Sequence, residues 1–241
     1  MSRNREILIA GTTDDVAREA AARFVALASE AIALRGRFSV LLSGGSTPRK
    51  LYSLLAQPPF VNAVQWEKIY LFFADERFVP HNHVESTYLL VRETLLDVAP
   101  IPLENCFPMP TEGITLEGAA ASYQEAIEAF FGTADDWAFD LAFLGMGPDG
   151  HTASLFPGRP DFSTSVGIVR GSPKPPPERL TLSLKAINRS RAVIFLVTGA
   201  DKADRVREIL GDDGSDCGLP AARVEASESA TVWLLDLQSA S

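Results

Sequence analysis

The chain has 241 residues, of which 46% are hydrophobic and 22% charged, so it can bury one large core. Asp and Glu number 31 against 22 Lys and Arg, which gives a formal net charge of −9. This balance argues against nucleic acid or an anionic membrane as the main partner, because either would require a basic face. A small anionic ligand stays possible, since it needs only a few local cations and backbone amides.

Cysteines and apolar runs indicate the protein's environment. Cys106 and Cys217 are far apart and outside any C-x-x-C motif. We therefore expect no disulfide, no thiolate zinc site and a reducing compartment. No apolar run approaches the roughly 20 residues of a membrane-spanning helix, and the run at 7–10 is too short for a signal-peptide core. We expect a cytoplasmic protein, and the sequence leaves its oligomeric state open.

Short, nearly continuous apolar runs predict buried strands at 39–42, 69–74, 140–144, 193–197 and 232–235. Apolar residues at helical spacing recur between them, and the first such stripe runs from Val16 to Leu34. This alternation predicts crossover units on a mostly parallel sheet with helices on both faces, in a single α/β domain over 1–241. The Pro-rich segment 172–178 is expected to be a loop. Ligands of such folds bind beyond the carboxyl ends of the strands.

After the first predicted strand come Gly44, Gly45, Ser46, Thr47 and Pro48. The glycines permit backbone conformations that direct several N–H groups to one place. Either hydroxyl can cap the next helix, whose N-terminus carries about half a positive charge. The segment is therefore a candidate anion site. A plain strand-to-helix turn would use the same residues, and this segment alone does not decide between the two.

Asp75, Glu76 and Arg77 follow the second predicted strand. Three consecutive charges at the end of a buried strand are costly unless that end opens to a solvated site. Arg77 can bind a phosphate through two hydrogen bonds, and one of the acids can orient a sugar hydroxyl or handle a proton. The alternative is a surface cluster of paired charges. His81 and His83, in the polar loop beyond, are expected to be exposed.

Asp149 and His151 follow the third predicted strand and its glycine-rich turn. With an unperturbed pKa of about 6.5, His151 is the best candidate for proton transfer near neutrality. Asp149 can orient its ring, as a carboxylate does in hydrolytic triads. The alternative is an Asp-capped turn with a structural histidine. No G-x-S-x-G motif is present, and three widely separated histidines make a poor zinc site, so no metal is expected.

Lys202 follows the fourth predicted strand, in the first turn of the next helix, where the helix dipole disfavours a cation. An anion held between Lys202 and the helix N-terminus would remove this conflict; a solvated lysine beside Asp201 is the alternative. Four strand ends thus converge on one requirement. The sequence predicts a site for a phosphate or another dianion, held by amides, Arg77 and Lys202, with Asp and His placed for proton chemistry.

These segments resemble those of the 6-phosphogluconolactonase family. The matching stretches run in the family's order: LLSGGSTPRKLY at 41–52, FFADERFVP at 72–80, LGMGPDGHTASLFPG at 144–158, SPKPPPERLTLS at 172–183 and VTGADKA at 197–203. The related glucosamine-6-phosphate deaminases share the glycine segment and the G-x-G-x-D-G-H core. After the histidine, however, this chain continues Thr-Ala-Ser-Leu-Phe-Pro-Gly, as in the lactonases. The resemblance implies a Rossmann-like three-layer α/β/α sandwich.

The resemblance also implies hydrolysis of 6-phosphoglucono-1,5-lactone to 6-phosphogluconate, in the oxidative pentose phosphate pathway and without a cofactor. His151 would accept a proton from water, Asp149 would orient His151, and Asp75 would hold a sugar hydroxyl or tune the site. The phosphate would be held by Gly44, Gly45, Ser46, Thr47, Arg77, Lys202 and, by family resemblance, Arg179. The alternatives are an amino-sugar-phosphate deaminase or isomerase of the same fold, and a non-catalytic sugar-phosphate sensor.

Overall fold

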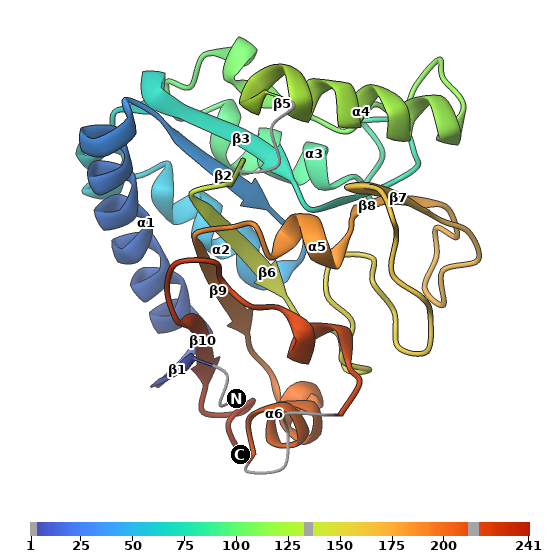
Figure 1. Cartoon of the computed structure of the whole chain (residues 1–241). Coiled ribbons are helices and arrows are strands. Elements are labelled where there is room, and N and C mark those ends of the chain that lie inside the picture. The colour runs from blue at the N-terminus through green and yellow to red at the C-terminus, as the bar shows by residue number, and fades with distance from the viewer. Residues whose placement is uncertain (1–3, 133–136, 212–216) are drawn as a thin grey trace.

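The structure is a computed structural model that describes residues 4–132, 137–211 and 217–241. The strands of its central sheet are β1 (Arg5–Ala10), β2 (Phe38–Leu42), β3 (Ile69–Phe73), β5 (Cys106–Phe107), β6 (Leu141–Gly145), β9 (Ala192–Val197) and β10 (Thr231–Asp236). They are parallel and lie in the order β1-β10-β9-β6-β2-β3-β5 (Figure 1). This order brings the carboxyl ends of β9, β6, β2 and β3 side by side.

Helices cover both faces of this sheet. The helices are α1 (Thr13–Arg35), α2 (Ser46–Leu55), α3 (Thr87–Val91), α4 (Leu116–Phe131), α5 (Leu184–Ile187) and α6 (Ala203–Leu210). α1 packs on α2 and on several strands, while Figure 1 shows α4 and α5 on the other side of the sheet. The predicted α/β/α sandwich is confirmed.

A second, smaller sheet stands beside the first. Its strands β4 (Asp75–Arg77), β8 (Arg179–Leu182) and β7 (Val166–Val169) pair antiparallel in the order β4-β8-β7. Sequence analysis predicted neither β7 nor β8 and treated 75–77 only as the end of the preceding strand. Elements of three or four residues are too short to show a periodicity. The expected loop at 172–178 is confirmed, and it leads into β8.

The five predicted strands are confirmed, each to within one residue at either end. β1 was missed because its apolar run is short and lies at the edge of the sheet, where Ile7 and Ile9 are about half exposed. The predicted stripe of α1 extends one residue too far, since Leu34 is 69% exposed near the helix end. One hydrophobic core joins the two sheets; the single domain over 1–241 stays a prediction.

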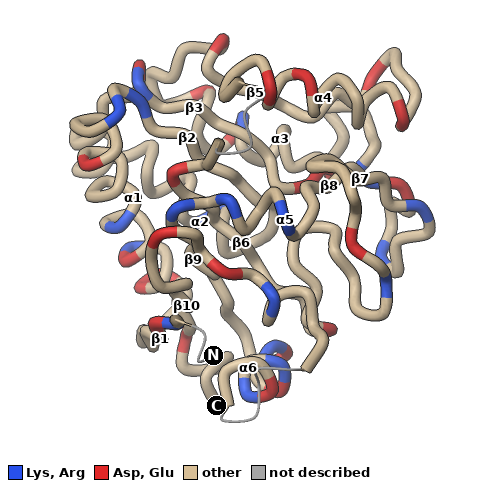
Figure 2. The backbone as a smooth tube through the Cα atoms, in the orientation of Figure 1, with Lys and Arg blue, Asp and Glu red and all other residues tan. Residues whose placement is uncertain are grey.

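Charges are spread over the outer elements. Figure 2 shows acidic residues along α4 and both signs of charge along α6. On α6, Arg205 pairs with Glu208 and Arg207 with Asp204. None of the helices in the described part of the chain has both the length and the apolar composition needed to cross a membrane.

Candidate active site

A cavity of about 190 Å³ opens where the central sheet meets the smaller one. It is lined by Ser43, Gly44, Asp75, Arg77, Gly145, Met146, Gly147, His151, Ala153, Lys174, Arg179 and Lys202. Six of the ten predicted site residues are therefore brought together: Gly44, Asp75, Arg77, His151, Arg179 and Lys202. The other four, Gly45, Ser46, Thr47 and Asp149, lie outside the lining.

His151 is held by Asp149. Its Nδ1 lies 2.5 Å from Asp149 Oδ1. Because an ionised carboxylate only accepts hydrogen bonds, Nδ1 carries the proton and Nε2 of the neutral ring is left with a free lone pair. Nε2 makes no hydrogen bond to any residue that the structure describes. An imidazole held in this tautomer at a cavity wall is suited to take a proton from water.

Electrostatics keep this pair in the form that a base requires. Burial lowers the pKa of His151 below 6.5 and outweighs Asp149, whose hydrogen bond and charge would raise it; the charge of Lys174 adds to the lowering. Burial alone would raise the pKa of Asp149, but its hydrogen bond and charge interaction with His151 hold that pKa below its usual value. At neutral pH the ring is therefore neutral and the carboxyl ionised.

The glycine-rich turn before His151 makes room for its ring. A Cβ on Gly147 would lie 2.1 Å from two atoms of the imidazole, which no packing could accommodate. Gly150 has a φ of 82° and faces Leu219, whose side chain would meet a Cβ at 2.8 Å. Both positions thus require glycine, one for close approach and one also for its backbone conformation.

Arg77 and Arg179 face each other across the smaller sheet. They are directly opposite in the antiparallel pairing of β4 with β8. Like charges at such positions repel, and neither guanidinium has a carboxylate partner among the described residues. Arg179, only 4% exposed, donates to the carbonyls of Lys174, Pro175 and Pro176. Two facing guanidinium groups whose hydrogen-bond partners are neutral have the charge and geometry to bind a dianion.

Arg77 also leaves hydrogen-bonding capacity unused. Its Nη1 donates to Glu85 O and Thr87 Oγ1, each at 3.3 Å. Its buried Nε has no partner within the described structure. A Cβ on Gly44 would lie 3.0 Å from Nη1 and 2.8 Å from Thr87 Oγ1. Gly44 therefore lets the guanidinium approach the backbone of the glycine segment, where an anion could bind both.

The rest of the glycine segment differs from the prediction. Gly45, with a φ of 127°, caps α2, and neither Ser46 nor Thr47 caps it through a side chain. Ser46 is the first helical residue and is exposed. The Thr47 hydroxyl shares a hydrogen bond of 2.7 Å with Thr198 Oγ1. What this segment offers an anion is therefore the helix N-terminus and its amides rather than hydroxyl groups.

Lys202 and Asp75 complete the predicted set. Lys202 precedes α6 and donates to Asp201 Oδ2 at 2.7 Å, so it both pairs with its neighbour and lines the cavity. Asp75 is 6% exposed, and its Oδ2 accepts a hydrogen bond from Ser154. His81 and His83 lie outside the lining. His83 is exposed as expected, whereas His81 is half-buried and bonds to Met109 O.

The family model for glucosamine-6-phosphate isomerases and 6-phosphogluconolactonase matches residues 11–233. The chain belongs to this family. A 6-phosphogluconolactonase of Rattus norvegicus is 42% identical over 210 residues, which cover 84% of this chain and 79% of the rat protein. Membership confirms the resemblance and the expectation of an enzyme, because both activities in the family's description are enzymatic.

Solved structures agree with this membership. The crystal structure of 6-phosphogluconolactonase from Thermotoga maritima has a TM-score of 0.83 at 32% identity, covering 96% of this chain and 99% of that one. A monomeric glucosamine-6-phosphate deaminase has a TM-score of 0.82 at 19% identity, covering 98% of both chains. The second likeness is one of fold alone.

Two charged residues were missed: Lys174, which lines the cavity, and Glu76, which lies outside the lining and supports Arg77. Lys174 lies in the Pro-rich loop, whose composition indicated only a lack of regular structure. Glu76 is 1% exposed and accepts hydrogen bonds from the backbone of Arg77, Thr87 and Tyr88 and from the Ser86 hydroxyl. Burial raises the pKa of Glu76. In the sequence, Glu76 stands out only by its position between the candidate residues Asp75 and Arg77. That position does not show that its side chain is buried and holds the loop next to Arg77.

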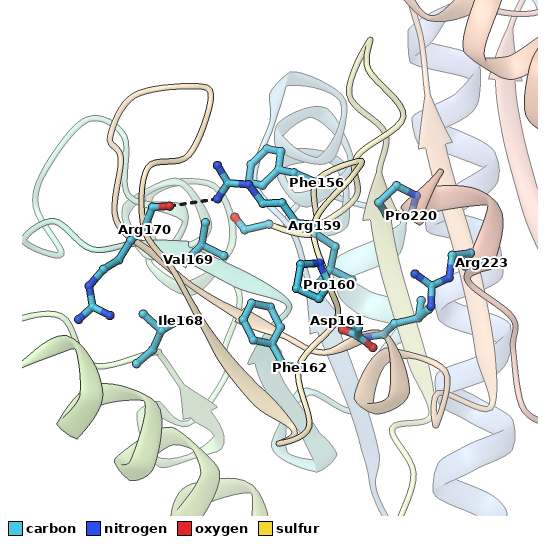
Figure 3. A pocket seen from close by; sticks show the side chains of 13 residues that line it. Phe156, Arg159, Pro160, Asp161, Phe162, Ile168, Val169, Arg170, Pro220 and Arg223 are labelled. Atoms are coloured by element: carbon cyan, nitrogen blue, oxygen red, sulfur yellow. Dashed lines mark hydrogen bonds between the residues drawn. The ribbon is translucent and has the colours of Figure 1, made fainter. Parts of the chain in front are cut away.

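A second cavity, of about 220 Å³, is lined in part by residues 154–156 (Figure 3). Ala153 lines the candidate site and Ser154 lines this second cavity. Most of its lining is apolar, including Phe156, Phe162 and Ile168. Arg159 donates to the carbonyls of Arg170 and Gly171, and Asp161 accepts from Leu184 N. The titratable groups suited to chemistry gather instead in the smaller cavity.

Across residues 4–132, 137–211 and 217–241, no three His, Cys, Asp or Glu side chains are grouped so as to hold a metal ion. The expectation that the protein uses no metal or cofactor stays a prediction.

Proposed function

We propose that this protein hydrolyses 6-phosphoglucono-1,5-lactone to 6-phosphogluconate in the oxidative pentose phosphate pathway. One observation carries the proposal: an imidazole oriented by a carboxylate and two facing arginines line the same cavity. The first is a base for water, and the second is a site for a phosphate dianion. The lactonase relatives support this choice of substrate.

The spacing of the two features supports a hexose phosphate. His151 follows β6 and Arg77 lies in β4, directly after β3, with β2 between those two strands. Neighbouring strands are about 4.8 Å apart, so the two strands that lead to these features, β6 and β3, are roughly 10 Å apart. A sugar ring with a phosphate on C6 and a water molecule at C1 spans a comparable length. We expect the phosphate at Arg77, Arg179 and Gly44, and C1 near His151.

The chemistry needs no covalent nucleophile, because a lactone carbonyl is already reactive and the enzyme has mainly to position water and stabilise charge. His151 Nε2 takes a proton from the water that attacks C1. The same proton passes to the ring oxygen as the C1–O bond breaks. Asp149 holds the ring and stabilises its charged form between the two transfers. Asp75, fixed on one side by Ser154, accepts a hydrogen bond from a sugar hydroxyl.

A coupled assay tests the proposal. A glucose-6-phosphate dehydrogenase generates the lactone, and the acid is followed as it appears. We expect its formation to be faster than spontaneous hydrolysis in proportion to the amount of protein added. In a parallel arm, the protein is incubated with glucosamine 6-phosphate and ammonia is measured. Ammonia release without lactone hydrolysis would favour the deaminase, and binding of both sugars without turnover would favour the sensor.

A further inference from the structure

Lys174 is a cation in the lining of the cavity, and the proposed steps of lactone hydrolysis assign it no role. It lies in the loop 172–178, and its carbonyl accepts a hydrogen bond of 3.0 Å from Arg179 Nη2. The loop is thus held on a buried guanidinium while the Lys174 side chain joins the cavity lining. The ammonium makes no ion pair or hydrogen bond with the described residues, whereas Lys202 is paired with Asp201.

Lys174 and His151 line the same small cavity. The charge of Lys174 helps to lower the pKa of His151. Arg77 and Arg179 face each other and suffice for the two negative charges of a phosphate. An unpaired ammonium near the base is therefore available to the atoms that react there.

The charges of the cavity point the same way. Its lining holds four cations, Arg77, Lys174, Arg179 and Lys202, and Lys202 is paired with Asp201. The phosphorylated lactone carries two negative charges, which Arg77 and Arg179 match. Hydrolysis creates a third negative charge, on the carboxylate at C1, and Lys174, unpaired among the described residues, is the cation of the lining that is left for it.

We propose that Lys174 binds the negative charge that develops at C1, first on the carbonyl oxygen and then on the product carboxylate. This inference rests on the proposed function. As the water oxygen bonds to C1, its proton passes to His151 and the carbonyl electron pair moves onto the exocyclic oxygen beside the ammonium. The pair returns as the bond from C1 to the ring oxygen breaks, and His151 gives that oxygen the proton. The new acid then loses its proton to solvent, and Lys174 stays protonated throughout.

Two ligands that differ at C1 test the proposal by calorimetry. 6-Phosphogluconate carries the carboxylate, and glucose 6-phosphate has the same phosphate without it. We expect Lys174→Met to weaken binding of 6-phosphogluconate about tenfold and that of glucose 6-phosphate less than twofold, since only the first ligand has charge at C1. Lys174→Arg should keep most of the difference between the ligands. Lys185→Met, at an exposed position on α5 outside the cavity, is the matched control.

Kinetics give an independent measure. Loss of one group that stabilises an oxyanion costs up to about 10²- to 10³-fold in kcat, and less where solvent can replace it. We expect kcat of Lys174→Met to fall about 10- to 100-fold while KM for the lactone changes little. The melting temperature of the variant should match that of Lys185→Met, because the Lys174 side chain is exposed.

Other outcomes would overturn the assignment. If Lys174→Met weakens the binding of both ligands equally, Lys174 is a phosphate ligand. If the affinity for neither ligand changes, Lys174 is a solvated side chain with no part in binding. Failure of the wild-type protein to bind 6-phosphogluconate more tightly than glucose 6-phosphate would also reject it. If the wild-type protein hydrolyses no lactone, the proposed function and the oxyanion step are refuted. If Lys174→Met then still weakens the binding of 6-phosphogluconate selectively, the assignment of Lys174 as a carboxylate ligand is kept.

Discussion

Ser154 Oγ donates a hydrogen bond of 2.6 Å to Asp75 Oδ2, although the two residues lie 79 positions apart in the chain. Both side chains are buried. Ser154 N also donates to Thr181 Oγ1 on β8 at 3.2 Å. The segment that carries His151 is therefore tied by two buried hydrogen bonds to the smaller sheet that carries Asp75 and the two arginines.

Replacing this hydroxyl should loosen that connection. Ser154→Ala leaves the buried Asp75 oxygen without its partner, so we expect a loss of about 1–3 kcal/mol in the free energy of unfolding. If Asp75 holds a sugar hydroxyl, KM for the lactone should rise as well. Urea unfolding and steady-state kinetics measure the two effects. Ser163→Ala, at an exposed site, is the control; equal stability of the two variants would contradict the expectation.

His151→Ala should lower kcat by about 10²- to 10⁴-fold, the usual contribution of a general base. Binding of 6-phosphogluconate should largely survive, because Arg77 and Arg179, the proposed phosphate ligands, are untouched. The matched control is His83→Ala, since His83 is exposed and outside the cavity. Wild-type turnover in the His151 variant would remove this residue from the mechanism.

The pH profile should report the lowered pKa of His151. The base is active only when neutral, so kcat/KM should stay constant near neutrality and fall on the acid side, with a midpoint below 6.5. Asp149 raises this pKa through its hydrogen bond and charge. Asp149→Asn should therefore move the midpoint to still lower pH and reduce the plateau, because the ring also loses its fixed tautomer. A midpoint that moves to higher pH would show that the pairing has been misassigned.

Inorganic phosphate should stabilise the wild-type protein by filling the gap between Arg77 and Arg179. A ligand that binds only the folded state raises the melting temperature as its concentration exceeds Kd. We expect this increase to be lost in Arg77→Gln. Without phosphate, the same variant should be no less stable than wild type, since a repulsive pair has been removed. Arg18→Gln, on the exposed surface of α1, controls for general salt effects; an undiminished phosphate shift in Arg77→Gln would refute the anion site.

Glu76 is expected to be a positioning residue for Arg77. Its carboxylate accepts four hydrogen bonds from the segment around Arg77 and the start of α3. Glu76→Gln turns an amide donor toward these donors, so we expect a loss of about 1–3 kcal/mol in stability. If the role is positioning, KM for the lactone rises at temperatures where the variant is fully folded, and kcat changes little. An unchanged KM in the folded variant would reduce Glu76 to a structural role.

Sequence patterns located five of the seven strands of the central sheet and missed the edge strands β1 and β5. The run 192–197 is apolar at every position, and 38–42 at every position except Ser39, because strands of a parallel sheet are buried on both faces. The residues after each strand could then be recognised, since a parallel sheet gathers its carboxyl ends at one edge. His151, Asp75, Arg77 and Lys202 were located in this way, and family resemblance added Arg179.

Which of these groups meet, and which of them are charged, follows only from the folded chain. The pairing of β4 with β8 sets Arg77 opposite Arg179, although about a hundred residues separate them, and no local pattern encodes such a register. The hydrogen bond between Thr47 and Thr198 and the position of Lys174 in the cavity lining also depend on segments that lie far apart in the sequence. Burial and partners at a distance also fix the pKa of His151. A sequence gives the groups and their order, whereas their charge states and contacts arise from neighbours that only folding brings together.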